Sequence, residues 1–124
     1  TAILFIVVIW LSTFSAIDGI EEDQAFTPQQ LRFTSVAEFE VARDTVLARC
    51  SMCHAAEPYW EGIAKAPKGV VLETDQQIAQ HAQQIYLHSA KSNAMPPANI
   101  TYMSVEERKQ IADWYAVAIG KEPL

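Results

Sequence analysis

Two cysteines and a histidine stand close together in the chain, as Cys50-Ser-Met-Cys53-His54. The pattern C-x-x-C-H places the thiols about one turn apart, so that both can face one edge of a planar ring. Thiols at this spacing add to the two vinyl groups of heme, and the adjacent imidazole can then bind the iron. The motif therefore predicts one covalently attached heme c per chain, held by Cys50, Cys53 and His54.

Two other uses of the cysteine pair can be weighed against heme. A C-x-x-C redox pair is typical of a βαβ context, and the soluble part of the sequence shows no strand pattern. A zinc site needs four ligands, so the two cysteines would need two further ligands arranged nearby. The chain contains only two cysteines, too few for a disulfide scaffold.

The iron of such a heme needs a ligand on its second face, and the candidates are Met52, Met95, Met103, His81 and His88. Met52 lies inside the attachment motif and cannot fold over the opposite face. Met95 precedes Pro96-Pro97, and a residue before proline is driven out of the helical region. We expect Met95, on a stiff extended segment, to be the ligand. Met103 and the two histidines remain alternatives, although histidines on a helix flank are more often surface residues.

Further residues could support the heme. The free ring N–H of His54 should donate to a carbonyl, for which Pro67 is the candidate. Tyr59, Trp60 and Tyr102 could reach the heme propionates, although plain packing is an equal alternative for each. With both axial positions filled, no position remains for oxygen or substrate, which predicts electron transfer. A displaceable Met95 would instead predict a heme sensor or a peroxidase.

Three helices should position these residues, each opened by Ser or Thr followed three residues later by Glu or Gln. They are expected at 36–49 after Ser35, at 75–90 after Thr74 and at 105–119 after Ser104. The first should end at the heme motif, and Gly120 can end the third. The expected apolar faces are Val36, Phe39, Val46, Leu47 and Cys50; Ile78, Ala82, Ile85 and Ser89, with Tyr86 alongside; and Ile111, Trp114, Tyr115 and Ala118.

The 124-residue chain opens on an apolar segment, in which 13 of the first 17 residues are apolar and none is charged. At about 1.5 Å per residue this segment spans roughly 25 Å, less than the hydrocarbon core of about 30 Å. Because the chain also lacks an initial methionine, we expect residues 1–17 to be the C-terminal part of a transmembrane helix with further residues upstream. A signal-peptide core and a buried strand are the alternatives.

The remaining residues divide into an acidic linker over 18–34 and a domain over 35–124. The net charge of the chain is −6, and residues 18–44 carry seven acidic and two basic residues. No basic run occurs, so the sequence predicts no nucleic-acid partner. Acidic flanks suit the non-cytoplasmic side of a membrane, although this rule counts lysine and arginine more than acids.

The sequence resembles a class I cytochrome c over about residues 36–119. The resemblance rests on a helix ending in C-x-x-C-H, a proline-containing loop, a methionine loop and a C-terminal helix with an aromatic pair. It implies an all-α fold of three to five helices around a covalent heme c. It also implies that the first and last helices cross, which would bring Phe39 and Val46 near Ile111, Trp114 and Tyr115.

Longer strings resemble the C-terminal cytochrome domain of bacterial membrane-bound urate hydroxylases (urate oxidases). They are Arg49-Cys-Ser-Met-Cys-His-Ala-Ala-Glu-Pro58 with Trp60, Ala66-Pro-Lys-Gly-Val70, Ala94-Met-Pro-Pro-Ala-Asn-Ile-Thr-Tyr-Met103, and Glu107-Arg with Ile111-Ala-Asp-Trp-Tyr115. In that family a multi-helix membrane domain precedes the cytochrome. The resemblance implies oxidation of urate to 5-hydroxyisourate, with electrons leaving through this heme.

This resemblance implies a location and partners. The cytochrome domain would face the periplasm from the bacterial inner membrane, and the upstream membrane domain would belong to the same polypeptide. Its redox partner would be a terminal oxidase or a soluble cytochrome c. Nothing in residues 1–124 indicates a urate site, so the chain by itself is expected to be an electron-transfer domain. The alternative is a stand-alone membrane-anchored cytochrome c that shuttles electrons between respiratory complexes.

Overall fold

The computed structural model describes residues 1–17 and 25–123, and within these ranges every regular element is a helix. The prediction of an all-α chain is therefore confirmed. The elements are α1 (Ala2–Ile17), α2 (Pro28–Thr34), α3 (Phe39–Arg49), η1 (Pro67–Gly69), α4 (Asp75–Gln80), α5 (Ala82–Ile85), η2 (Tyr86–Ala90), η3 (Pro97–Asn99) and α6 (Val105–Ala118).

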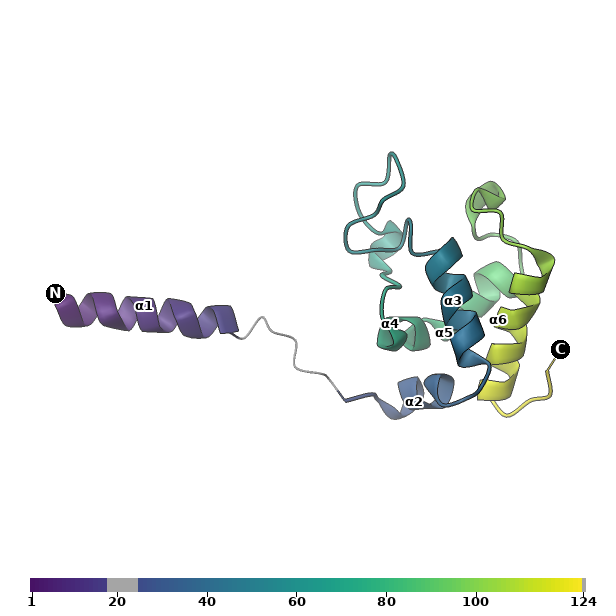
Figure 1. The fold of residues 1–124 in the computed structure, drawn as a ribbon, viewed down its shortest axis with the longest axis horizontal. Coiled ribbons are helices and arrows are strands. Elements are labelled where there is room, and N and C mark those ends of the chain that lie inside the picture. Colours follow the sequence, from purple (N-terminus) through teal and green to yellow (C-terminus); the bar gives the residue numbers. More distant parts are fainter. Residues whose placement is uncertain (18–24, 124) are drawn as a thin grey trace.

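The apolar segment at the start of the chain forms helix α1, with exposed large side chains from Ile3 to Leu11. Figure 1 shows α1 standing apart from the other helices. In the part of the chain that the structure describes, no helix combines the length and the apolar character needed to cross a membrane. Residues 18–24, which hold all four acidic residues of the expected linker 18–34, lie outside the described residues.

The second half of the expected linker is helix α2, which packs against α4 and α6. Thr27 and Gln30 form a reciprocal capping box, and Pro28 occupies the first turn, where its missing N–H is not needed. Phe33 carries the helix into the core, because its ring lies 5.7 Å from the Trp114 ring and its carbonyl accepts from the Trp114 indole N–H at 2.8 Å. The packed unit therefore begins before Ser35, the expected boundary.

Helix α3 begins three residues later than expected, at Phe39. Ser35 ends α2 by donating its N–H to the Leu31 carbonyl, so it does not cap the next helix. Phe39, the first residue of α3, donates its N–H to the Val36 carbonyl at 3.1 Å. The face of α3 is as expected at Phe39 and Val46, which are buried, but Leu47 is exposed.

The helix expected over 75–90 has the predicted capping box at Thr74 but breaks at His81. The break separates α4 from α5, and the last turn widens into the π-helical segment η2. The predicted face survives the break, since Ile78, Ala82, Ile85 and Ser89 are all buried.

Helix α6 crosses α3 and completes the core. Its predicted capping box is present, with Ser104 accepting from the Glu107 N–H, and Gly120 has the positive φ of 77° that suits a helix end. Trp114 is fully buried, and its ring centroid lies 5.9 Å from that of Phe39 on α3. The expected contact between the two helices is therefore observed.

Two long loops lie at the same end of this helical unit. Residues 50–74 follow α3, residues 91–104 precede α6, and Figure 1 shows them on either side of the C-terminal end of α3. Since the heme motif stands at that end and Met95 lies in the second loop, the crossing of α3 and α6 determines how the candidate ligands are placed.

Replacing Phe33 by alanine tests whether α2 belongs to the folded unit. Phe33 is 6% exposed, so Phe33→Ala should lower the free energy of unfolding by about 3 kcal/mol, as measured by urea titration. Leu31→Ala on the same helix is the matched control, because Leu31 is 51% exposed and should cost well under about 1 kcal/mol. Equal effects of the two substitutions would show that α2 is not packed as described.

Candidate functional site

The C-x-x-C-H motif, Cys50 to His54, forms a single closed turn at the end of α3. The Cys50 N–H donates to the Val46 carbonyl at 2.8 Å and so continues the helix. The N–H groups of Cys53 and His54 then both donate to the Cys50 carbonyl, at 3.2 and 2.9 Å. Both thiols are free and half-buried, so the turn carries two unbonded sulfurs beside an imidazole.

The imidazole of His54 is held by a main-chain carbonyl. Its Nδ1 lies 2.9 Å from the Val70 carbonyl oxygen, which only accepts hydrogen bonds, so Nδ1 carries the proton and donates it. Nε2 is then the unprotonated nitrogen, the form that binds a metal. The acceptor expected from the sequence was Pro67, and this assignment is wrong. The Pro67 carbonyl instead accepts from the Val70 N–H in the tight turn η1, where Lys68 has a φ of 55°.

The segment around Val70 is itself tied to the motif. The Leu72 N–H donates to the His54 carbonyl at 2.7 Å, and the Ser51 hydroxyl donates to the Leu72 carbonyl at 2.5 Å. The Ala56 N–H donates to the Glu73 carboxylate at 3.0 Å. The motif and the Val70–Glu73 segment therefore form one hydrogen-bonded unit, which fixes the orientation of the His54 ring.

The protonation of the cysteines argues against a thiol redox site. Burial raises the pKa of the Cys50 thiol to about 12, with a further upward contribution from Cys53 and an opposing one from Arg108. Burial also raises the pKa of Cys53. Catalytic redox cysteines need a lowered pKa, because the thiolate is the nucleophile. These two thiols are instead neutral near pH 7.

Met95 is held at its main chain on both sides. Its N–H donates to the His88 carbonyl at 2.8 Å, and its carbonyl accepts from Arg108 Nη1 at 2.9 Å. The side chain of Met95 is half-buried. Met103, the other methionine considered, is only 3% exposed and packs in the hydrophobic core. Burial therefore distinguishes the two methionines: the Met103 side chain packs in the hydrophobic core, and the Met95 side chain does not.

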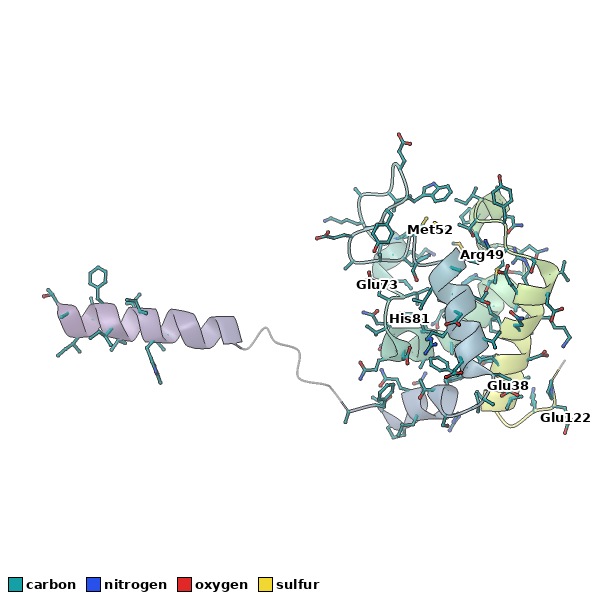
Figure 2. All side chains as sticks on the ribbon, viewed as in Figure 1. Glu38, Arg49, Met52, Glu73, His81 and Glu122 are labelled. Carbon is teal, nitrogen blue, oxygen red and sulfur yellow. The ribbon has the colours of Figure 1, made fainter. Side chains whose placement is uncertain are left out.

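Arg49 joins the motif to the methionine loop and to α6. Its Nη1 donates to the Thr101 carbonyl at 2.8 Å, and the Thr101 hydroxyl donates back to the Arg49 carbonyl at 2.9 Å. Its Nη2 lies 2.9 Å from Glu107 Oε1 in an ion pair. Figure 2 shows Arg49 beside Met52 at the upper end of α3, with His81 farther down the molecule. The residue that precedes Cys50 thus ties three segments together.

The remaining candidates have main-chain roles or lie at the surface. Tyr102 is 83% exposed and Tyr59 is also exposed, whereas Trp60 is half-buried. The His81 Nδ1 lies 2.9 Å from the Gln77 carbonyl within its own helix, and His88 is exposed. No group of three or more His, Cys, Asp or Glu side chains suited to a metal ion occurs in residues 1–17 and 25–123.

The sequence does not predict the roles of three residues at this site, Val70, Arg49 and Arg108, which hold the candidate ligands or their loops by hydrogen bonds. Val70 acts through its carbonyl, which no side-chain pattern reveals. The arginines are the clearer signal, since both lie next to residues that the sequence does single out, Cys50 and the Glu107 of the capping box.

The Arg49–Glu107 pair predicts a pH dependence of stability. Burial raises the pKa of Glu107, but hydrogen bonds from Arg49 and Ser104 outweigh it, and the net pKa lies below the ordinary value of 4.5. A lowered pKa gives stability that is present above pH 4.5 and is lost as the pH falls through the folded-state value. Glu107→Gln, which keeps the capping box, should therefore cost about 1 kcal/mol at pH 7 and little once the carboxyl is protonated.

Urea titrations of both proteins between pH 3 and pH 7 measure this difference. Glu106→Gln is the matched control, because Glu106 is exposed on the same first turn of α6. A cost for Glu107→Gln that stayed constant over the whole pH range would contradict the ion pair.

No family model, curated protein or solved structure gives a significant match to this chain.

Proposed function

We propose that the described part of the chain after α1 is a heme c electron-transfer domain of the class I cytochrome type. The observation that carries the proposal is the C-x-x-C-H turn, in which the His54 ring is fixed through Nδ1 by the Val70 carbonyl, at 2.9 Å. This bond leaves Nε2 as the only ring nitrogen able to bind iron. The two free thiols one turn away supply the attachment points for the vinyl groups.

Met95 is the proposed second axial ligand. Its main chain is held on both sides, and its loop lies across the end of α3 from the loop that holds His54. Met103 is committed to the core, Met52 belongs to the attachment turn, and His81 is bonded within its own helix. His88 is exposed, so Met95 is the half-buried candidate whose side chain has no other role among the described contacts.

Histidine and methionine together favour electron transfer. A bound heme would supply an iron that takes up and releases one electron, and a soft, neutral thioether stabilises the reduced state relative to a second histidine. The protein's part is to fill both axial positions and to hold them, which excludes oxygen and other small ligands. Burial raises the pKa of both thiols of the motif, which argues against their use as thiolate nucleophiles.

We extend the proposal to the whole protein through the longer sequence strings. The domain would be the C-terminal part of a membrane-bound urate hydroxylase, and residues 1–17 would end its last membrane helix, with the cytochrome in the bacterial periplasm. Urate oxidation to 5-hydroxyisourate would occur in the upstream part, and the electrons would pass through this heme to a terminal oxidase or a soluble cytochrome c. A stand-alone membrane-anchored cytochrome c is the alternative.

Production of the chain in cells that mature c-type cytochromes tests heme attachment. The chain should carry heme that stays attached after denaturation, and the Cys50→Ala, Cys53→Ala double variant should not.

Substitution of the two methionines tests the ligand. In Met95→Leu the thioether–iron charge-transfer absorption should disappear, the reduced protein should bind carbon monoxide, and the reduction potential should fall by on the order of 100 mV.

Met103→Leu is the control, since it removes a thioether from the core with little change of volume. It should keep the absorption and the potential of the original chain. If Met95→Leu kept both, the assignment of Met95 would be refuted. If the unchanged protein bound carbon monoxide readily, the heme would belong to a sensor or a peroxidase instead.

The coding sequence upstream of Thr1 distinguishes the two whole-protein proposals. Urate hydroxylase requires several membrane helices in the same reading frame, and membranes containing the full protein should oxidise urate while reducing this heme. A stand-alone cytochrome requires a start codon and a few basic residues just before Thr1. Full-length protein that reduces the heme with other donors but never with urate would rule out the first.

A further inference from the structure

The side chain of Arg108 bonds to three segments that surround Met95. Its Nη1 donates to the Ser89 carbonyl at 2.6 Å and to the Met95 carbonyl at 2.9 Å, and its Nη2 donates to Asn99 Oδ1 at 3.2 Å. Ser89 lies near the end of η2, just before the loop, and Asn99 ends η3 within the loop. One side chain thus links the helix end before Met95, Met95 itself and the short turn after it.

The methionine loop, residues 91–104, contributes only Met103 to the hydrophobic core. Residues 91–94 are all exposed, and Pro96 is buried directly after Met95. The main chain of Met95 is held in addition by hydrogen bonds on both sides. The His88 carbonyl fixes the peptide before Met95, and Arg108 fixes the peptide after it. With both peptide planes held, only rotations within the side chain remain to place the sulfur.

Arg108 can perform this task because its own backbone is anchored. It stands in the first turn of α6, where its N–H donates to the Ser104 carbonyl at 3.1 Å. The same helix is held in the core by the fully buried Trp114 and Ile111. Its neighbour Glu107 pairs with Arg49 beside the heme motif. The guanidinium is thus a rigid link between the core and the loop.

We propose that Arg108 is the positioning residue for the Met95 ligand, acting through the Met95 and Ser89 carbonyls and the Asn99 side chain. This inference rests on the proposed function, since it concerns the heme ligand named there. A thioether is a weak, neutral ligand, so its bond to iron depends on how well the protein holds the sulfur in place. Loss of Arg108 should shift the equilibrium from bound to released Met95 by about tenfold or more, as expected when charge-assisted hydrogen bonds are lost.

The experiment compares Arg108→Ala with Lys109→Ala in the heme-loaded protein. Both substitutions remove one positive charge from adjacent positions of α6, and Lys109 bonds to Asp113 at the surface, away from the loop. Arg108→Ala should weaken the thioether–iron absorption, increase carbon monoxide binding by the reduced protein about tenfold and lower the reduction potential. Lys109→Ala should leave all three unchanged. If Arg108→Ala keeps the helix content of the original protein, a general folding defect cannot account for these three changes.

A second variant covers the case in which Arg108→Ala does not fold. Arg108→Gln keeps a polar side chain whose single amide nitrogen cannot reach all three acceptors, so its values should lie between those of Arg108→Ala and the original protein. Absorption, carbon monoxide binding and potential equal to those of the original protein in either folded variant would overturn the positioning role. If the original protein itself showed no thioether–iron absorption, the proposed function would fail, which is a distinguishable result.

Discussion

Two guanidinium groups hold the loops on which the candidate site depends. The loops at the end of α3 contribute few residues to the hydrophobic core, so hydrogen bonds to their carbonyls help to define their positions. Arg49 and Arg108 donate to the carbonyls of Thr101, Ser89 and Met95 from helices that are fixed by the core. The planar fork of five donors suits this task, because one side chain can satisfy several acceptors with a fixed geometry. Glu107 neutralises the charge of Arg49, so the cluster is stabilised as a unit.

The helices were predictable to the extent that their signals are local. The capping boxes at Thr74 and Ser104 and the apolar faces of the second and third helices are confirmed. Helix α2 is not among the helices that the sequence predicts, because the polar composition of residues 18–34 favours a linker. Its local signal is nevertheless present, since Thr27-Pro28-Gln-Gln30 has the same capping pattern with proline in the first turn. Ser35 is the C-cap of α2 and has helical φ and ψ, and α3 starts only after Glu38, which makes no side-chain cap hydrogen bond. The break at His81 has no local signal that we can identify.

The sequence identifies the candidate site through its side chains but not through the main-chain groups that hold them. The sequence alone singles out the two thiols, the imidazole and Met95, because each has a distinctive ligand chemistry. It could not identify the Val70 carbonyl, whose direction depends on the turn at Lys68, where φ is positive without a glycine. Nor could it pair Arg49 with Thr101, since that contact joins segments far apart in the sequence. Such contacts follow from the crossing of α3 and α6 and become visible only in three dimensions.

The distribution of the core gives a physical reason for a prosthetic group at this end of the molecule. The hydrophobic cluster joins α2 to α6 through residues such as Phe33 and Trp114, yet no described residue from Ala56 to Gly69 belongs to it. That loop is held by hydrogen bonds around the motif and by the turn η1. A heme attached at Cys50 and Cys53 would present a large apolar face to this loop, supplying the burial that its side chains do not provide for one another. The same group would then complete the fold and carry the electron, and the arginine-held loops would keep both axial ligands in place in either oxidation state.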